Sequence, residues 1–546
     1  MAAGTGIYIT WITGAILLSI AMMPLFRPPY AKLRLDGFID MFRRYWAHMV
    51  VVFSVYLWKD LLDGVDRVLM ANTQLDMTPY VYAIEGDIVL WVQQELRNAV
   101  LDQTLTHLYV MGFMTVTFAS FLYPVYFDDR HMADRVSALG PGALAESEWV
   151  EAGLVSPNMT SIREYRLQRV RDKLIEFDCA GILLYDPVNI RYATDSTNMS
   201  IWTSHNAARY ALVMTQGPVI VFEFDGHEFL SNHNPLITEV RPAITYLYFT
   251  AGEFSKRKAK IWAKEIAEIV TQFGHGNKRL ALDHCATEGV HQLEEQGLEL
   301  ANGEEVMELA RLIKSEEEIV AMRRSIFACE KSIELMRSHC EPGITEQKLW
   351  SHFQMEAVSR GAEWIETRLL AAGPRANPWY HECSSRPIQN GELIGFDSDL
   401  VGAYGYCTDI SRTWMCGDKS ASSAQKEIYT MAYEQVQQNL EILRPGLTFK
   451  ELSFSCREYP KSEFRHYSML YHGVGLCDEY PAIPFTWEWN ENSCDGVIRP
   501  GMVLTVESYV GRCDGGPGVK LEEQVLITEK GHEVLSNYPF ESDLLL

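Results

Sequence analysis

The segment of residues 396–414, FDSDLVGAYGYCTDISRTW, constrains the fold of this chain more than any other stretch. It places three acids, Asp397, Asp399 and Asp409, among apolar and aromatic residues. Asp397 and Asp399 are two positions apart, so on an extended strand both side chains leave the same face. A turn at residues 402–405 would fold a second strand back and bring Asp409 beside them. The segment therefore predicts a hairpin with three carboxylates on one face.

Buried carboxylates that lie together repel each other at neutral pH unless a cation holds them. Two divalent ions that share bridging carboxylates answer this requirement, because such a site needs more oxygen ligands than one ion does. The alternative is a polar hairpin whose acids are solvated and bind nothing.

Later parts of the chain supply further candidate ligands. His472 opens HGVGLCDEYP, where glycines allow close approach of the backbone. Glu507 lies in MVLTVESYV and Glu522 in VKLEEQVLIT, two strand-like runs in which a lone acid is costly unless it is coordinated. The predicted metal ligands are Asp397, Asp399, Asp409, His472, Glu507 and Glu522.

The order of these ligands resembles that of the pita-bread fold of the creatinase, prolidase and methionine aminopeptidase superfamily. Within it, residues 159–540 are similar to the dimethylsulfoniopropionate lyase family DddP. The similarity includes DPVNIRYATDSTNMSIWTSHNAARYALV, the metal hairpin and YHGVGLCDEYP. The extra acid two residues before the usual first Asp, and the Asp-Glu pair after HGVGL, match the lyase branch more specifically. The resemblance implies an α+β fold, with a pita-bread catalytic domain preceded by a creatinase-like α/β domain.

For function, the resemblance implies a metal-dependent lyase that cleaves dimethylsulfoniopropionate to acrylate and dimethyl sulfide by base-assisted β-elimination. Asp478 stands where the peptidases carry the histidine of an HE pair, so it is the candidate base that takes the proton alpha to the carboxylate. The two metal ions would be iron or zinc by preference, with manganese or cobalt as alternatives. Two other functions stay open: an Xaa-Pro aminopeptidase or dipeptidase, and a metal-stabilised binding module without activity.

A sulfonium substrate favours contact with aromatic faces, as quaternary ammonium ligands do. Tyr467 in HYSML and Trp202 in NMSIWTSHN are the candidate substrate-binding residues, together with His381, which lies nearest to a second assisting histidine of the peptidases. In pita-bread dimers the N-terminal domain of one subunit can cover the site of the other. The resemblance therefore implies a homodimer in which Trp202 acts across the interface.

The N-terminal 1–130 segment is expected to be a membrane-associated helical region with about three hydrophobic segments. Residues 7–26 and 108–127 are uncharged and long enough to span a bilayer, whereas 47–58 is short and could be interfacial or buried. Basic residues in the first loop favour a cytoplasmic loop, and three spans would then leave the catalytic domain in the cytoplasm; two spans would place it outside. The region resembles the front part of PAP2-type membrane phosphatases, without their catalytic signatures. A fusion and a joined gene model both remain open.

Composition shifts after this region suggest a linker over 131–158, an α/β domain over 159–313 and the catalytic domain over 314–546. Thr345 in PGIT is the candidate N-cap of a helix in the catalytic domain. The formal net charge of -24 and the lack of a basic stripe argue against nucleic acid, so the expected partner is a small molecule. The 11 cysteines include no C-x-x-C pair, which predicts free thiols.

Overall fold

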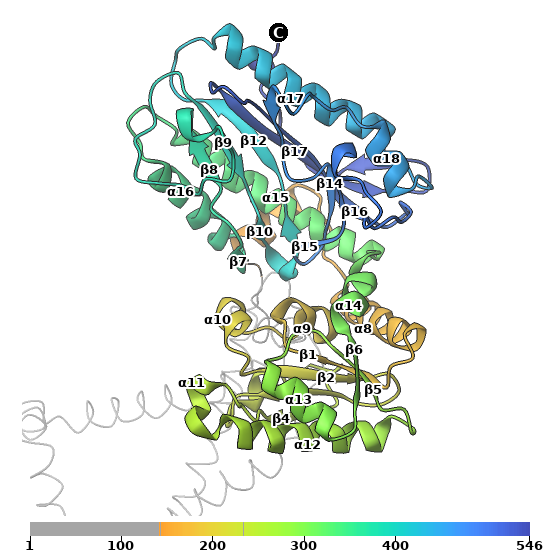
Figure 1. The fold of residues 1–546 in the computed structure, drawn as a ribbon. Coiled ribbons are helices and arrows are strands. Elements are labelled where there is room, and N and C mark those ends of the chain that lie inside the picture. Colours follow the sequence, from red (N-terminus) through yellow and green to blue (C-terminus); the bar gives the residue numbers. More distant parts are fainter. Residues whose placement is uncertain (1–140, 142, 233) are drawn as a thin grey trace, which may run out of the picture. The chain divides into compact units, whose positions relative to one another are not determined.

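The computed structural model describes residues 141, 143–232 and 234–546 (Figure 1). The predicted membrane-associated region, residues 1–130, lies outside them. Among the residues described, no helix has both the length and the apolar character needed to span a bilayer. All cysteines in the described part are free, as the sequence predicts.

The expected linker is helical over part of its length. Helix α7 (Ala143–Glu151) lies inside the 131–158 segment and buries Trp149 completely. The indole Nε1 donates to the carbonyl of Arg324 at 3.0 Å, and the Arg324 guanidinium lies 4.7 Å from the ring centroid. The Gly- and Pro-containing composition suggested a linker, but the buried Trp149 and the ion pairs Glu146–Arg324 and Glu148–Arg360 dock this helix onto later segments of the chain.

The α/β part is built around one six-stranded mixed sheet, with the order β4-β3-β2-β1-β5-β6. Its strands are β1 (Gly181–Leu184), β2 (Tyr210–Met214), β3 (Val219–Glu223), β4 (Glu239–Pro242), β5 (Arg279–Leu282) and β6 (Glu299–Asn302). Its helices are α8 (Met159–Glu176), α9 (Pro187–Thr194), α10 (Ser200–His205), α11 (Tyr248–Ala251), α12 (Ser255–Phe273), α13 (Thr287–Glu295) and α14 (Gly303–Arg311). Strands β1, β2 and β3 are buried throughout, which explains their continuous apolar sequences.

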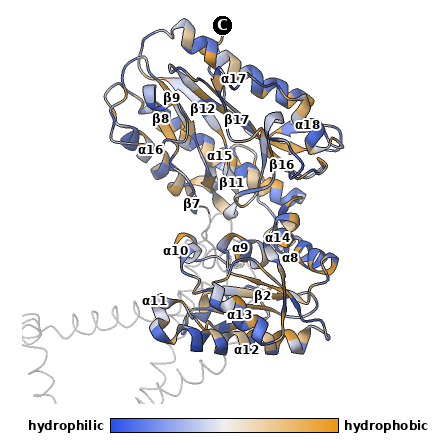
Figure 2. Cartoon of the chain, viewed as in Figure 1, coloured by the Kyte–Doolittle hydropathy of each residue, from blue (hydrophilic) through white to orange (hydrophobic). Residues whose placement is uncertain are grey.

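Helix α12 shows how the sequence selects the packing of this part. Its buried residues follow the spacing of one helical face: Ala259, Trp262, Ala263, Ile266, Ala267, Ile269 and Val270. Lysines occupy much of the opposite face, so hydrophilic and hydrophobic residues alternate along the helix in Figure 2. The apolar face closes a core with the central strands of the sheet.

The catalytic part combines curved antiparallel sheets with long helices. Its helices are α15 (Glu316–Ser338), α16 (Glu346–Ser359), α17 (Ser423–Ile442) and α18 (Phe449–Ser455). Its strands are β7 (Trp364–Ile365), β8 (Leu370–Ala372), β9 (Leu393–Asp397), β10 (Leu400–Val401), β11 (Cys407–Thr408), β12 (Ser411–Met415), β13 (Phe464–Arg465), β14 (Tyr471–Val474), β15 (Asp478–Ile483), β16 (Val503–Arg512), β17 (Gly518–Ile527) and β18 (His532–Val534).

Three sheets of the catalytic part meet at the site. Two are small, with the orders β11-β10-β7 and β12-β9-β8, and the third runs β15-β14-β16-β17-β18, with β13 on β16. Strand β17 contacts β12 and β9, while α17 packs on β16 and β17 (Figure 1). Thr345 caps α16 by accepting the Lys348 N–H at 3.2 Å, which confirms the predicted N-cap.

The metal hairpin differs from its expected form at Asp399. Strand β9 ends at Asp397, and Asp399 has a φ of 36°, so the two acids do not share one extended strand. The chain changes sheets here, because β9 pairs with β8 and β12 whereas β10 pairs with β7 and β11. The left-handed conformation of Asp399 makes this change of direction, and Asp adopts this conformation more readily than most residues do.

Candidate metal centre

The six predicted ligands come together although their segments are distant in the sequence. Two groups of donor atoms each lie within 4.8 Å of one another. The groups are Asp409 with His472, Glu507 and Glu522, and Asp397 with Asp399 and Asp409. All six side chains are buried. Because Asp409 belongs to both groups, the arrangement offers two neighbouring cation positions that share a carboxylate.

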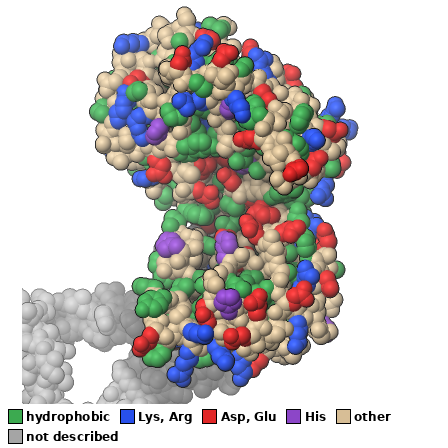
Figure 3. All heavy atoms as spheres, viewed as in Figure 1, with side chains coloured by type: hydrophobic (Ala, Val, Ile, Leu, Met, Phe, Trp, Pro, Cys, Tyr) green, Lys and Arg blue, Asp and Glu red, His purple; other side chains and the backbone are tan. Residues whose placement is uncertain are grey.

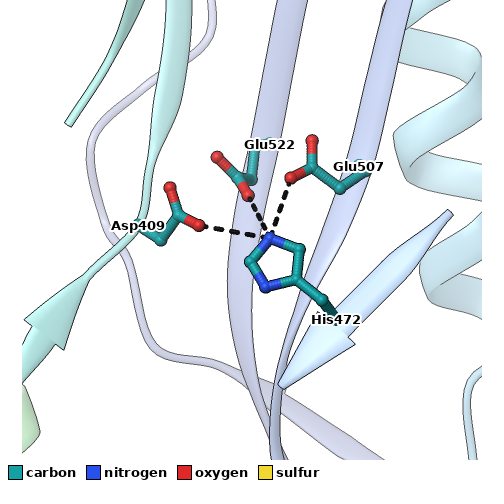
Figure 4. A group of neighbouring side chains, drawn as sticks. All are labelled: Asp409, His472, Glu507 and Glu522. Carbon is teal, nitrogen blue, oxygen red and sulfur yellow. Dashed lines mark hydrogen bonds and ion pairs between the residues drawn. The ribbon is translucent and has the colours of Figure 1, made fainter. Parts of the chain in front are cut away.

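The two glutamates face each other across one strand pair. Glu507 on β16 and Glu522 on β17 are direct partners in the antiparallel register. Directly opposed side chains leave the same face of a sheet and approach closely. Figure 4 shows both carboxylates directed at the His472 ring, with Asp409 entering from the other side.

The imidazole of His472 is oriented with Nε2 toward the acids. Nε2 lies 3.2 Å from Glu507 Oε1, 3.3 Å from Asp409 Oδ2 and 3.9 Å from Glu522 Oε1. Nδ1 lies 3.1 Å from the carbonyl of the adjacent Gly473. A Cβ at Gly473 would stand 2.5 Å from the Tyr480 carbonyl, so glycine is required for this close approach. A histidine with Nδ1 on a carbonyl presents Nε2 as a metal ligand.

Hydroxyl groups hold the aspartates of the hairpin. Ser411 Oγ donates to Asp397 Oδ1 at 2.6 Å or to Glu522 Oε2 at 2.8 Å, and Thr367 Oγ1 donates to Asp399 Oδ2. These hydrogen bonds orient the carboxylates of Asp397, Asp399 and Glu522.

Burial and mutual repulsion raise the pKa of several carboxyl groups in the cluster. Burial first, then Glu522, raises the pKa values of Asp409 and Glu507 well above the ordinary range. Burial also raises the pKa of Asp397, to about 6. Burial alone would lower the pKa of His472, but its hydrogen bond to Glu507 and the nearby acids raise it to about 10. A bound cation would relieve this repulsion between the buried carboxylates.

The donor set accommodates a cation. Within the described part of the chain, Asp409 Oδ1 and Glu522 Oε1 are buried and make no hydrogen bond. Buried polar atoms are rarely left in this state, and a site that binds an ion is one of the recognised reasons for it. Oxygen and imidazole ligands in this number suit divalent metal ions.

Asp478, the predicted base, borders the cluster instead of joining it. It is the first residue of β15, its side chain is 53% exposed, and Oδ1 lies 3.9 Å from His472 Nδ1. The surrounding protein removes part of the water around this carboxylate and so raises its pKa, and His472 opposes this shift. A carboxylate in this position can meet a ligand that enters from solvent.

The adjacent Glu479 anchors the loop that carries Asp478. Its buried carboxylate pairs with Arg311 Nε at 3.1 Å and Lys314 Nζ at 2.9 Å, and it accepts the Leu476 N–H at 2.9 Å. A Cβ at Gly475 would lie 2.4 Å from this carboxylate, which explains the second glycine of HGVGL. The two acids of the Asp-Glu pair therefore differ in position: Glu479 is buried, and Asp478 is half-exposed beside His472.

Tyr467 lies beside the cluster, and the Lys520 ammonium already contacts the face of its ring. Lys520 Nζ lies 4.3 Å from the Tyr467 ring centroid. Tyr380 stacks on the same residue, with centroids 5.3 Å apart. His381 is not brought to the cluster by any contact among the described residues: its Nδ1 lies 2.9 Å from the Arg375 carbonyl, within its own loop. The neighbouring Tyr380 reaches toward the site instead.

Trp202 lies in the α/β part, on α10. Its ring is partly buried and lies 6.0 Å from the ring of Phe224, with no contact to the cluster among the described residues of this chain. Its predicted role across a dimer interface stays a prediction.

Sequence reasoning missed two further groups at the site. Lys520 is fully buried with Nζ among the acids, and Ser411 bonds two of them. The signal for Lys520 was present, since in VKLEEQVLIT it stands two positions before Glu522 and so shares its face.

Acidic residues also surround the approach to the site. On the face shown in Figure 3, Asp and Glu side chains gather over the region of β7, β10 and β15. Glu366 belongs to this region: its N–H donates to the Asp399 carbonyl at 3.0 Å. Burial and then Asp478 raise its pKa to about 7.

Comparisons with known proteins agree on the family. Residues 320–529 match the model of metallopeptidase family M24. The dimethylsulfoniopropionate lyase DddP of Roseovarius nubinhibens is 43% identical over 74% of this chain and 93% of the relative. The DddP lyase of Roseobacter denitrificans is 42% identical over 74% of this chain and 92% of the relative.

Solved structures give the same fold. The Xaa-Pro dipeptidase of Bacillus anthracis superposes with a TM-score of 0.56 at 24% identity, covering 69% of this chain and 98% of that one. The prolidase of Pyrococcus horikoshii gives 0.56 at 22% identity, covering 69% and 99%. At these identities the likeness shows the pita-bread fold alone. The chain therefore belongs to the DddP family, within the metallopeptidase M24 fold.

Proposed function

We propose that this protein is a metal-dependent lyase that converts dimethylsulfoniopropionate to acrylate and dimethyl sulfide. The observation that carries the proposal is the position of Asp478, a half-exposed carboxylate 3.9 Å from the His472 ring at the edge of a buried donor cluster. Relatives named as DddP lyases that are more than 40% identical support the choice of substrate.

Six residues would hold the metal ions, in two positions that share Asp409: Asp397, Asp399, Asp409, His472, Glu507 and Glu522. When bound, the ions would supply the positive charge that binds the substrate carboxylate and acidifies the adjacent C–H. Iron or zinc is the preferred occupant, and manganese or cobalt is compatible with the same donors.

The remaining steps belong to the side chains. Asp478 takes the proton alpha to the substrate carboxylate, the electron pair of that C–H bond forms the C=C bond of acrylate, and the C–S bond breaks. Dimethyl sulfide leaves with the electrons of the broken bond, and the proton remains on Asp478 until solvent removes it. Tyr467 stays the predicted contact of the sulfonium group, although Lys520 Nζ already lies 4.3 Å from its ring centroid and Tyr380 stacks on the same ring.

The test is to incubate the purified full-length protein with dimethylsulfoniopropionate and, separately, with an Xaa-Pro dipeptide. Equimolar acrylate and dimethyl sulfide without peptide cleavage is the expected result. Cleavage of the dipeptide without dimethyl sulfide would instead make the protein a peptidase.

The Asp478→Asn variant addresses the base directly. It should lose about 10²- to 10⁴-fold in kcat while retaining bound metal, because it removes only proton transfer. Asp514→Asn, at an exposed position in the same part, is the matched control and should retain full activity. An Asp478→Asn protein with unaltered kcat would remove Asp478 from the mechanism.

A further inference from the structure

Lys520 is a fully buried cation among the predicted metal ligands. Its Nζ lies 2.6 Å from Glu507 Oε2, 3.3 Å from Glu522 Oε2 and 3.5 Å from Asp397 Oδ2. It also lies 2.7 Å from Ser411 Oγ. Removing an ammonium group from water costs several kcal/mol, so it stays buried only where acids pair with it. These three carboxylates meet that condition.

The ammonium and the imidazole take different oxygens of the two glutamates. Lys520 contacts Oε2 of Glu507 and Glu522, whereas His472 Nε2 faces their Oε1 atoms. The Oε1 atoms therefore remain directed at the space between the glutamates and Asp409. Lys520 can keep its contacts while a cation occupies that space.

The charge balance of the cluster is also compatible with a charged Lys520 when the metal ions are bound. Five carboxylates form the predicted ligand set with one histidine. When they are ionised, the Lys520 ammonium leaves a net charge of minus four, which two divalent cations cancel. Without metal ions, the ammonium is a positive charge within 3.5 Å of three of these acids.

We propose that Lys520 is a positioning residue: a built-in counter-ion that holds Asp397, Glu507 and Glu522 in place before the metal ions bind. It attracts the carboxylates in the metal-free protein and repels an arriving cation, because charges a few ångströms apart interact strongly in a buried site. Lys520 thus stabilises the empty site and weakens its affinity for metal. The inference rests on the metal site of the proposed function.

The test compares Lys520→Met with the wild type, as full-length proteins, using Zn²⁺ as the probe. Methionine keeps most of the side-chain volume and removes the charge. The Tm of the chelator-treated variant should fall by at least about 5 °C more than the Tm of its zinc-loaded form. The dissociation constant for Zn²⁺ in a calorimetric titration should decrease at least about tenfold. Lys520→Arg keeps the charge and should retain the wild-type zinc affinity, and Lys530→Met controls for loss of an exposed lysine.

Equal losses of Tm with and without zinc, or an unchanged or weaker zinc affinity, would overturn the proposal. If the chelated variant does not fold, added zinc must restore cooperative unfolding, and failure to do so has the same consequence. A wild-type protein that binds no zinc and no other divalent metal contradicts the proposed function instead, so the two failures are distinguishable.

Discussion

At the scale of single residues, the site consists of acids whose charges are costly in the absence of a cation. Glu507 and Asp409 are completely buried and their pKa values are raised, first by burial and then by Glu522. Burial raises the pKa of Glu522 as well, but Lys520, the hydrogen bond with Glu507, His472 and Ser411 together outweigh burial and lower this pKa. The pKa shifts therefore differ in direction within the cluster: the partners of Glu522 favour its charged form, whereas burial favours the neutral forms of Asp409 and Glu507.

The raised pKa values of His472 and Asp397 predict how pH affects the stability of the metal-free protein. The pKa of His472 is about 10 in the folded state against about 6.5 in unfolded chains, and that of Asp397 is about 6 against about 3.9. The folded state therefore binds more protons than the unfolded state near neutral pH, and its stability falls as pH rises. The free energy of unfolding should decrease by about 2 kcal/mol from pH 6.5 to pH 8.

Urea unfolding in the presence of a chelator measures this dependence. The metal-loaded protein is the control: its ligands must be deprotonated, so it should lose less stability over the same range or gain some. A chelated protein that becomes more stable toward pH 8 would show that these groups are not protonated in the folded state.

At the scale of elements, the catalytic groups depend on how strands and loops are anchored. The loop before β15 turns Asp478 outward because Glu479 is fixed inward by Arg311, at the end of α14, and by Lys314. The hairpin between β9 and β12 depends on Asp399 adopting a left-handed conformation. Neither feature follows from periodicity alone.

Replacing Glu479 by Gln should loosen the Asp478 loop. Removing the charge leaves Arg311 and Lys314 buried without their partner, which destabilises a protein by about 3–5 kcal/mol in comparable cases. We expect kcat for the proposed elimination to fall at least about tenfold, because small displacements of a reacting group have large effects. Bound metal, measured by elemental analysis, should be unchanged.

Glu491→Gln, at an exposed position between β15 and β16, is the matched control for this variant. If Glu479→Gln lowers Tm but retains the full kcat, the carboxylate stabilises the fold without positioning Asp478.

At the scale of the whole described chain, a buried ionic network joins the α/β part to the catalytic part. Arg166 on α8 pairs with Glu318 on α15 at 3.1 Å, and its guanidinium lies 4.7 Å from the Tyr406 ring centroid. Tyr406 donates to the same Glu318 at 3.0 Å and stands directly before β11 of the metal hairpin. The α/β part thus supports the hairpin that carries Asp409.

Arg166→Met should therefore destabilise the protein by about 3–5 kcal/mol, because Glu318 is left buried and uncompensated. The double variant with Glu318→Gln should recover a large part of this loss, since both charges are then absent. Chemical unfolding of the single and double variants gives the comparison, with the exposed Arg257→Met as control. Additive losses would show that the pair is not coupled.

The six candidate ligands could be singled out from the sequence because each lies in a short motif whose chemistry is local. The structure brings the donor atoms of Asp409, His472, Glu507 and Glu522 together, and their role as metal ligands stays a prediction. The spacing places Lys520 on the same face as Glu522, but its contacts with Asp397 and Glu507 depend on strand register, which the sequence does not give. The stacking of Tyr380 on Tyr467 depends on loop direction. The linker expectation failed at α7 because burial of Trp149 is a tertiary contact that composition does not encode.

The central claim is that a pair of cations in this cluster is needed for the elimination of dimethyl sulfide. The most direct measurement is to titrate the metal-stripped full-length protein with Fe²⁺ or Zn²⁺ while recording the rate of dimethyl sulfide release. We predict a rate that rises from near zero and saturates at two ions per chain. Full activity in the presence of excess chelator, with no bound metal, would contradict it.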